Sequence, residues 1–573
     1  MLSPLNVFRH FPITARRSEG HRFALGAVVI LHLAALVVLF KTETELLPKL
    51  VFLLTWGLLN GFWLIVLRRP VVSAALSLTL VAVLIALSQF KHDVVLMTAS
   101  FVDLMVIDSD TASFLFAIFP KLRWIVAGLA ALAVPLFVLL WRIDSIRVPW
   151  RVAALGTGIC LAGLSSVALA VPIDRETLFY DEEYVSKFAR SAVTSMVDLS
   201  THGLMQADAV AHGGLGKAAP IACQPPNRRP HIVMVLDESS FDISAAPGVK
   251  VPAGYQDRFQ SFDGKTRSLF VEGAGGPTWY TEYNILTGLS VRSFGRFADF
   301  VTRIAAGHIA RSLPNALHEC GYRSFSLYPW FGAFLGARHF QETLGIDRFL
   351  DAKNLHAEDV EPDAFYYNYT ADLIGRERRD GRPLFILTYL MANHFPWDSR
   401  FRKDLAPDWH DLGNRTVDGH SIDEYLRRQD MSTHDYRDFV ARLRRDFPNE
   451  PFLVVRFGDH QPLFAKKIID PALDDAAIGR RIEAGDPRYF RTYYAIDAIN
   501  FQPADLASAV DGLDAAYLPL VVLEAAGMPL NPSFAEQKRI LKRCNGLFYL
   551  CAAGAETRRF NRLLIDAGLI KQL

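Results

Sequence analysis

Acidic and histidine residues follow three short apolar runs in the second half of this 573-residue chain. Each of them lies within four positions of the end of its run: Glu238, His394, Asp459 and His460. Ligands gather at the carboxyl ends of parallel strands, so we expect these side chains to converge on one edge of a sheet. Carboxylate and imidazole groups together suit one divalent ion, Mn²⁺, Mg²⁺ or Zn²⁺, and ligand type alone does not choose among the three.

A threonine that could act as a nucleophile follows a Gly-rich segment at 273–276. Glycine allows a sharp turn, and Thr278 then opens a helix-like stretch that ends at Gly288. At a helix N-terminus, free N–H groups and the helix dipole stabilise both an alkoxide and an approaching phosphate. An ordinary capping threonine would have Glu or Gln three positions later, but that position is Thr281, and the acid is Glu282.

The elements that must position these residues are short strands alternating with helices. Their continuous apolar character is typical of strands buried on both faces of a largely parallel sheet. The runs are residues 232–236, 269–271, 324–327, 384–390, 452–457 and 518–523. We therefore predict an α/β fold for this half of the chain.

The first half of the chain has the pattern of a membrane domain. Five stretches are about 19 to 21 residues long and almost free of charge, which is enough to cross a hydrocarbon core of roughly 30 Å. They are residues 22–40, 48–67, 71–89, 122–141 and 152–172. The net charge of +1 disfavours a nucleic-acid-binding protein, because such proteins usually carry a basic surplus.

Positive charges near the span ends predict the orientation. The N-terminal segment and the second and fourth connections are rich in arginine, whereas the other connections mix lysines with acids. The arginines are Arg9, Arg16, Arg17, Arg22, Arg68, Arg69, Arg142, Arg147 and Arg151. We expect a cytoplasmic N-terminus, and an odd number of spans then puts everything after Pro172 on the outer face.

The composition predicts three parts: a membrane domain at 1–173, a juxtamembrane helix and linker at 174–230, and a catalytic domain at 231–573. The middle part begins with an amphipathic stretch and ends in a Gly-, Ala- and Pro-rich segment at 209–230. Four cysteines would face an oxidising compartment and allow three pairings: Cys223, Cys320, Cys544 and Cys551. We favour a Cys544–Cys551 bond, with four buried, reduced cysteines as the alternative.

Residues 278–288, from Thr278 to Leu286-Thr287-Gly288, are similar to the nucleophile signature of the alkaline phosphatase and sulfatase superfamily. The chain as a whole resembles the lipoteichoic acid synthase and phosphoglycerol transferase branch. That resemblance implies five transmembrane helices followed by an extracytoplasmic, sulfatase-like α/β domain with a mostly parallel sheet. It also implies an integral protein of a bacterial cell (inner) membrane.

The resemblance assigns roles residue by residue. It makes Glu238, Thr278, Asp459 and His460 the ligands of one divalent metal ion, with neighbouring Asp237 as an alternative to Glu238. It makes Thr278 the nucleophile and places His394, within Asn-His-Phe-Pro, at the phosphoryl group. There His394 would stabilise a phosphoryl oxygen or protonate the leaving alcohol. The segment around Trp330 and Arg338 resembles the part of the family that holds the lipid headgroup.

These roles imply a membrane-anchored transferase that moves phosphoglycerol from phosphatidylglycerol to a glycan or polymer hydroxyl through a covalent threonine intermediate. A phosphoethanolamine transferase acting on lipid A or a glycan is the alternative, and a non-catalytic binding or regulatory relative is a third. The phosphoethanolamine branch usually reads Asp-His-Gly-Glu and has a Pro-Cys pair in the nucleophile helix, whereas this chain has Gln461-Pro462 after His460 and no cysteine near Thr278. Threonine cannot become formylglycine, which disfavours a sulfatase.

Overall fold

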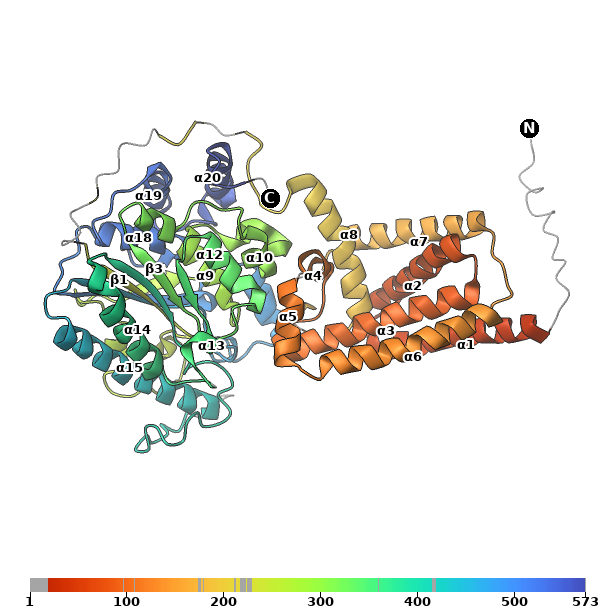
Figure 1. Cartoon of the computed structure of the whole chain (residues 1–573), viewed down its shortest axis with the longest axis horizontal. Coiled ribbons are helices and arrows are strands. Elements are labelled where there is room, and N and C mark those ends of the chain that lie inside the picture. The colour runs from red at the N-terminus through yellow and green to blue at the C-terminus, as the bar shows by residue number, and fades with distance from the viewer. Residues whose placement is uncertain are drawn as a thin grey trace. The chain divides into compact units, whose positions relative to one another are not determined.

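The computed structural model describes residues 19–95, 97–107, 109–173, 177–178, 180–210, 213–216, 223, 229–358, 360–414 and 419–571 (Figure 1). The chain forms two compact units. One consists of Met1–Ile107 and Leu115–Thr201, and the other of Asp108–Phe114 and His202–Leu573. The domain boundaries at 173 and 230 remain predictions, and most of the predicted linker at 209–230 lies outside the described residues.

The first unit contains the five predicted membrane helices. Each helix is long and apolar enough to span a membrane, which confirms this part of the sequence interpretation. They are α1 (Glu19–Thr42), α2 (Leu46–Leu67), α3 (Pro70–Val95), α6 (Leu122–Ile143) and α7 (Trp150–Ala170). Short helices α4 (Phe101–Val106) and α5 (Ser109–Ile118) separate α3 from α6.

The predicted amphipathic stretch forms helix α8 (Tyr184–His202). Val185 and Ala189 are buried on one side, whereas Met196 is exposed. The Val185 amide donates a hydrogen bond of 3.1 Å to Oε1 of Glu43, which follows α1. Helix α8 is therefore built into the first unit through its N-terminal half.

The second unit is built on one eight-stranded sheet in the order β4-β3-β5-β1-β6-β7-β2-β8. Strand β7 runs antiparallel to its neighbours β6 and β2, and the other neighbouring pairs are parallel. The strands are β1 (His231–Asp237), β2 (Arg267–Phe270), β3 (Arg323–Leu327), β4 (Arg348–Leu350), β5 (Leu384–Tyr389), β6 (Phe452–Gly458), β7 (Arg491–Ile499) and β8 (Leu513–Asp514). The mostly parallel α/β architecture is as predicted.

Helices cover both faces of this sheet (Figure 1). On one face lie α14 (Asp363–Glu377) and α15 (Gly419–Asp446), which share an apolar core with the central strands. On the other face lie α9 (Thr278–Thr287), α12 (Ala337–Thr343) and α18 (Leu518–Ala525). Every residue of β1, β5 and β6 is buried, which explains the unbroken apolar runs in the sequence.

The prediction of a strand at 518–523 was wrong, because these residues form helix α18. All eight residues of α18 are buried, so the run is apolar on every side, and a buried helix then has the same pattern as a buried strand. Pro519 lies in the first turn, where a missing N–H group does not interrupt the helix. Strands β4, β7 and β8 were not predicted; β4 and β8 are short, and β7 carries polar residues.

Four of the cysteines form two disulfide bonds. Cys544 pairs with Cys551, as favoured from the sequence, and Cys223 pairs with Cys320 across 97 positions of the chain. Both bonds lie in the second unit, and Cys160 in α7 remains reduced. Paired cysteines are typical of an oxidising compartment.

Candidate active site

The adjacent strands β1 and β6 bring the predicted metal ligands together. Asp237 pairs with Gly458 in the parallel register, so the residues that follow, Glu238 and Asp459, leave the sheet side by side. A Cβ atom on Gly458 would lie 1.9 Å from the carbonyl oxygen of Ser240. Only glycine therefore allows the two strand ends to approach this closely.

The consecutive acids at the end of β1 have different partners. Asp237 accepts a hydrogen bond of 2.9 Å from Nη2 of Arg258 and another from the hydroxyl of Tyr493, all of them buried. Oε1 of Glu238 instead lies 3.5 Å from Nε2 of His460. Asp237 is thus committed to a buried ion pair, and Glu238 is the acid that faces the candidate metal site.

Glu238, Asp459 and His460 form a buried cluster whose potential ligand atoms lie within 4.8 Å of one another. Oδ1 of Asp459 accepts hydrogen bonds from the amides of Ser239, at 2.8 Å, and of His460, at 2.9 Å. Oδ2 of Asp459 is buried, lies 3.3 Å from Nε2 of His460, and accepts no hydrogen bond from the residues that the structure describes. A buried carboxylate oxygen left in this state fits a cation that completes its coordination.

The ionisation of the cluster also fits a cation. Burial raises the pKa of Glu238, and it raises the pKa of Asp459 to about 7, with the nearby Glu238 charge acting in the same direction. For His460, burial lowers the pKa, but Asp459 and Glu238 outweigh it and the net shift is upward. Nδ1 of His460 lies 2.8 Å from the Gln461 carbonyl oxygen, so Nδ1 carries a proton and Nε2 is free to bind a metal ion.

Thr278 lies at the first position of helix α9, directly beside this cluster. Its Oγ1 atom is 3.4 Å from Nε2 of His460. The preceding turn places Gly275 at φ +79° and Gly276 at φ +150°, conformations that side chains rarely adopt. The glycines therefore set the angle at which α9 starts, and the helix presents the Thr278 hydroxyl to the carboxylates.

Helix α9 is fixed to the sheet by polar groups deeper in the protein. Oγ1 of Thr281 donates a hydrogen bond of 2.6 Å to the carbonyl oxygen of Asp459. Glu282 is fully buried and accepts a hydrogen bond of 2.8 Å from Nε2 of Gln341, which also donates to the hydroxyl of Tyr389. Burial raises the pKa of Glu282 to about 7. Glu282, which lies one position beyond the capping-box position, is thus part of the buried network that holds helix α9 in place.

His394 lies on the segment that follows β5. Nδ2 of its neighbour Asn393 donates a hydrogen bond of 3.3 Å to the carbonyl oxygen of Glu238, which joins this segment to the metal cluster. Burial lowers the pKa of His394, the charge on His460 lowers it further, and Asp459 opposes the shift. His394 is therefore close enough for the charges of the cluster to act on it, as its predicted role requires.

The backbone of the His394 segment is held by an arginine that the sequence analysis did not single out. Arg428 on α15 donates hydrogen bonds of 2.7 Å to the carbonyl oxygen of His394 and 2.8 Å to that of Pro396. Its Nε atom donates to Glu424 at 2.8 Å. The spacing of Glu424 and Arg428 predicts only an ordinary i,i+4 helix pair, because the carbonyl groups that Arg428 contacts are distant from it in the sequence.

A second buried acid supports the same segment from α14. Oδ1 of Asp363 accepts hydrogen bonds from the amides of Met391, at 3.2 Å, and Ala392, at 3.1 Å.

Glu272 is also an acid at the end of an apolar run, but its partners lie around helix α9. It accepts hydrogen bonds from Asn284, at 2.8 Å, and from the Val291 amide, at 2.6 Å, so it holds the C-terminal end of α9.

The predicted headgroup residues lie in a different network. Nη2 of Arg338 forms an ion pair of 2.7 Å with Asp351, and Nη1 donates to the Phe349 carbonyl oxygen at 2.8 Å. The arginine side chain is 36% exposed, so part of it stays accessible beside these partners. Trp330 is also partly exposed. The structure brings Glu238, Asp459, His460 and Thr278 together, whereas a headgroup role for Arg338 and Trp330 stays a prediction.

Comparison with known proteins supports the fold. Residues 260–479 match the sulfatase family, which confirms the predicted sulfatase domain. The matched range includes Thr278, His394, Asp459 and His460, and it begins after Glu238. No curated protein matches the chain.

Several solved structures are similar to this chain at low sequence identity. The phosphoglycerol transferase GacH of Streptococcus pyogenes, in complex with sn-glycerol-1-phosphate, is 16% identical, covers 63% of this chain and 100% of its own, and has a TM-score of 0.45. The lipoteichoic acid synthase LtaP of Listeria monocytogenes is 16% identical over 54% of this chain and 76% of its own, with a TM-score of 0.38. The C-terminal periplasmic domain of EcEptC from Escherichia coli is 15% identical over 55% of this chain and 87% of its own, with a TM-score of 0.37.

Proposed function

We propose that this chain, which carries a sulfatase domain over residues 260–479 and five membrane-competent helices, is a metal-dependent phosphotransferase that acts on a membrane lipid. The observation that carries the proposal is the position of Thr278. Its Oγ1 atom, at the first residue of α9, lies 3.4 Å from Nε2 of His460, which belongs to a buried cluster with two acids. The donor is phosphatidylglycerol, and the acceptor is a hydroxyl group of a glycan or polymer.

Glu238, Asp459 and His460, together with the Thr278 oxygen, are the residues that would hold one divalent ion, Mn²⁺, Mg²⁺ or Zn²⁺. Such an ion supplies positive charge that stabilises the alkoxide form of Thr278 and the charge that develops on phosphorus. The protein contributes the low-polarity surroundings and the fixed positions of the ligands. The positive end of the α9 helix dipole adds positive potential at the same point.

In the first half-reaction, Oγ1 of Thr278 attacks the phosphorus of phosphatidylglycerol. The O–P bond to Thr278 forms as the P–O bond to diacylglycerol breaks. The threonine proton leaves to solvent, and an equivalent proton reaches the diacylglycerol oxygen from the imidazolium form of His394. The products are diacylglycerol and phosphoglyceryl-Thr278.

In the second half-reaction, a hydroxyl group of the acceptor attacks the same phosphorus. His394 accepts its proton, the bond between phosphorus and Thr278 breaks, and Oγ1 regains a proton. The phosphoglyceryl group ends on the acceptor, and the enzyme returns to its starting state. A threonine nucleophile suits this transfer, whereas the formylglycine of sulfatases can only be made from cysteine or serine.

The membrane helices and the disulfides support the donor and the location. A substrate whose phosphorus lies at the headgroup level requires a catalytic domain tethered to the membrane surface, since tethering raises the local concentration of substrate. The arginine-rich connections favour a cytoplasmic N-terminus and an extracytoplasmic sulfatase domain. The bonds Cys223–Cys320 and Cys544–Cys551 suit that side. Arg338 and Trp330 are assigned to the headgroup, with Arg338 pairing to its phosphate.

Product analysis with the purified full-length chain tests this function. Phosphatidylglycerol and phosphatidylethanolamine, each labelled in the headgroup, are supplied in detergent with a divalent ion. We expect diacylglycerol from phosphatidylglycerol, and no release by the Thr278→Ala variant. Release from phosphatidylethanolamine alone would make the chain a phosphoethanolamine transferase, and release from neither lipid would reject a membrane-lipid donor.

A further inference from the structure

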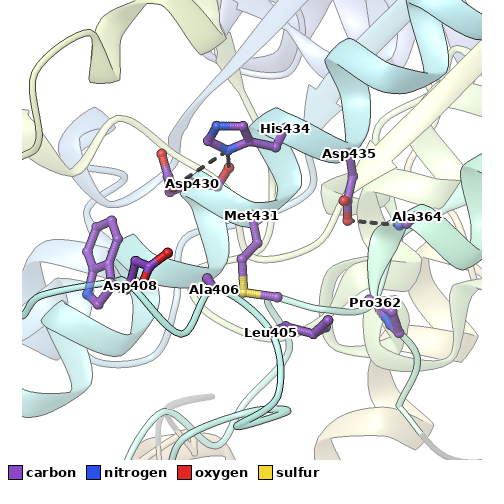
Figure 2. A pocket seen from close by; sticks show the side chains of 10 residues that line it. Pro362, Ala364, Leu405, Ala406, Asp408, Asp430, Met431, His434 and Asp435 are labelled. Carbon is purple, nitrogen blue, oxygen red and sulfur yellow. Dashed lines mark hydrogen bonds and ion pairs between the residues drawn. The ribbon is translucent and has the colours of Figure 1, made fainter.

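A pocket lined by both apolar and charged residues lies near the segment that carries His394. It has a volume of about 520 Å³ and lies between the start of α14, the middle of α15 and the segment 405–409. In Figure 2, Met431 extends from α15 toward Leu405 and Ala406, with Pro362 on the opposite wall. This acceptor pocket, as we call it, contains none of the predicted metal-site or headgroup residues.

Hydrogen bonds hold the walls of the acceptor pocket, and one set of them reaches the active-site segment. Pro362 and Ala364 line the pocket, and Asp363 between them accepts hydrogen bonds from the amides of Met391 and Ala392. Ala392 is two residues from His394, a separation of at most about 7 Å along the backbone. On the other side, Arg427 donates to the Leu405 carbonyl oxygen at 2.9 Å. The wall of the pocket and the catalytic segment are therefore parts of one hydrogen-bonded assembly.

The lining combines an apolar surface with carboxylates. Trp409, Met431 and Leu405 supply the apolar part, and the charged groups are Asp408, Asp430, Asp435 and His434. Three acids against one histidine repel an anion, which excludes phosphatidylglycerol and other phosphate-bearing ligands from this pocket. A neutral ligand with an apolar face and several hydroxyl groups fits both parts of the lining.

The carboxylates are placed to accept hydrogen bonds. Oδ2 of Asp435 already accepts a bond of 2.9 Å from the Ala364 amide, and Oδ2 of Asp430 lies 3.6 Å from Nδ1 of His434 (Figure 2). Their remaining lone pairs are available to hydroxyl donors. The indole Nε1 of Trp409 is buried and lacks a hydrogen-bond acceptor among the described residues. Because this nitrogen is inaccessible, the carboxylates supply the polar contacts of the pocket.

We propose that the acceptor pocket binds a neutral sugar unit of the glycan that receives the phosphoryl group. A sugar ring has an apolar C–H face for Trp409 and Met431, and its hydroxyl groups donate hydrogen bonds to the carboxylates. The inference rests on the proposed function for the identity of the acceptor. Binding in the pocket holds the chain of sugars beside the segment that carries His394.

The first test measures binding alone. The purified full-length chain in detergent is applied to an array of neutral oligosaccharides, with a cationic chitosan oligomer and phosphatidylglycerol as comparison ligands. We expect binding to neutral oligosaccharides, weakened about tenfold or more by Trp409→Ala and several-fold by Asp430→Asn. Trp409→Phe, which keeps an aromatic face, should retain most of the binding. Asp438→Asn, an exposed change on the same helix, is the matched control and should have no effect.

The second test separates binding of the acceptor from the reaction with the lipid donor. In Trp409→Ala, diacylglycerol release from phosphatidylglycerol should be unchanged, whereas the KM for the best oligosaccharide in the transfer reaction should rise about tenfold. Failure of the wild-type chain to release diacylglycerol would count against the proposed function and leave the binding result intact. The pocket proposal is overturned if no neutral oligosaccharide binds, if binding survives Trp409→Ala unchanged, or if only the cationic oligomer or the anionic lipid binds.

Discussion

Oγ1 of Thr278 lies 3.4 Å from Nε2 of His460, although 182 positions of sequence separate the two residues. One helical turn deeper, Thr281 is hydrogen-bonded to the carbonyl oxygen of Asp459, the residue before His460. The nucleophile helix is therefore fastened directly to the loop that carries two metal ligands. This arrangement positions the hydroxyl before any substrate arrives.

The two threonines of α9 should respond differently to substitution. Thr278→Ala removes the attacking oxygen and should abolish turnover with little change in the melting temperature. Thr281→Ala removes only a buried hydrogen bond, which should lower the free energy of unfolding by about 1 to 3 kcal/mol and leave measurable activity. Diacylglycerol release and thermal melting of the full-length variants check both statements. Full activity in Thr278→Ala would contradict the covalent mechanism.

The consecutive acids at the end of β1 give a second matched pair. Glu238→Gln should reduce metal binding strongly and leave the metal-free protein at least as stable as the wild type, because a buried and poorly compensated carboxyl is removed. Asp237→Asn leaves Arg258 without its buried charge partner and should lower the free energy of unfolding by about 3 to 5 kcal/mol. The metal content of any folded Asp237→Asn protein should be close to normal. Elemental analysis and melting curves distinguish the pair, and metal loss confined to Asp237→Asn would reverse the assignment.

The raised pKa of Asp459 predicts how pH acts on the metal-free protein. Its folded-state pKa of about 7 lies above the ordinary value of 3.8, so its contribution to stability is fully present below pH 3.8 and is lost as the pH rises through 7. Chelator-treated wild-type protein should therefore lose melting temperature between pH 4 and about 7 more steeply than Asp459→Asn does. The variant comparison is needed because burial also raises the pKa values of Glu282 and Asp363 to about 7.

Addition of a divalent ion should oppose this loss. Metal binding requires the ionised carboxylates and releases their protons, so Mn²⁺ should raise the melting temperature more at pH 8 than at pH 5. Melting curves at both values, with and without the ion, measure the effect. Equal stabilisation at both pH values, or stabilisation of Asp459→Asn to the same extent, would contradict the assignment of the ligand.

Arg428 should act on catalysis by positioning His394. In Arg428→Lys, a single ammonium group replaces a planar fork that contacts several carbonyl oxygens, so the His394 segment should become less well ordered. We expect kcat to fall about tenfold or more while the bound metal stays constant. Arg437→Lys, an exposed change on the same helix, is the control. A fall in metal content that parallels the loss of kcat would point to general damage instead.

The sequence predicted this fold well where the physical signal is local. Spans of about 20 apolar residues have few alternatives to membrane helices, and α1, α2, α3, α6 and α7 were all found. The run at 518–523 was misassigned because an apolar stretch of this length lacks a period that separates a strand from a buried helix. Strand β7 was missed because its polar residues bond to partners distant in sequence, for example Arg491 to Ser268.

The candidate site was likewise predictable where the signal is local, and it was not where partners are distant in the sequence. Strand-end residues are readable because a parallel sheet collects them at one edge, and the structure does bring Glu238, Asp459 and His460 together. The choice between Asp237 and Glu238 was open, because it depends on Arg258 and Tyr493, which are distant from β1 in the sequence. The roles of Arg428 and Asp363 were not predicted, since both act through backbone groups that any residue would carry.

The measurement that tests the central claim most directly is the mass of the peptide that contains Thr278 after the wild-type chain reacts with phosphatidylglycerol and no acceptor. We predict the added mass of one phosphoglyceryl group on that peptide, diacylglycerol in matching amount, and loss of the adduct when an acceptor hydroxyl is supplied. Thr278→Ala should show neither product. Diacylglycerol release without any adduct on Thr278, or an adduct on another residue, would contradict the account.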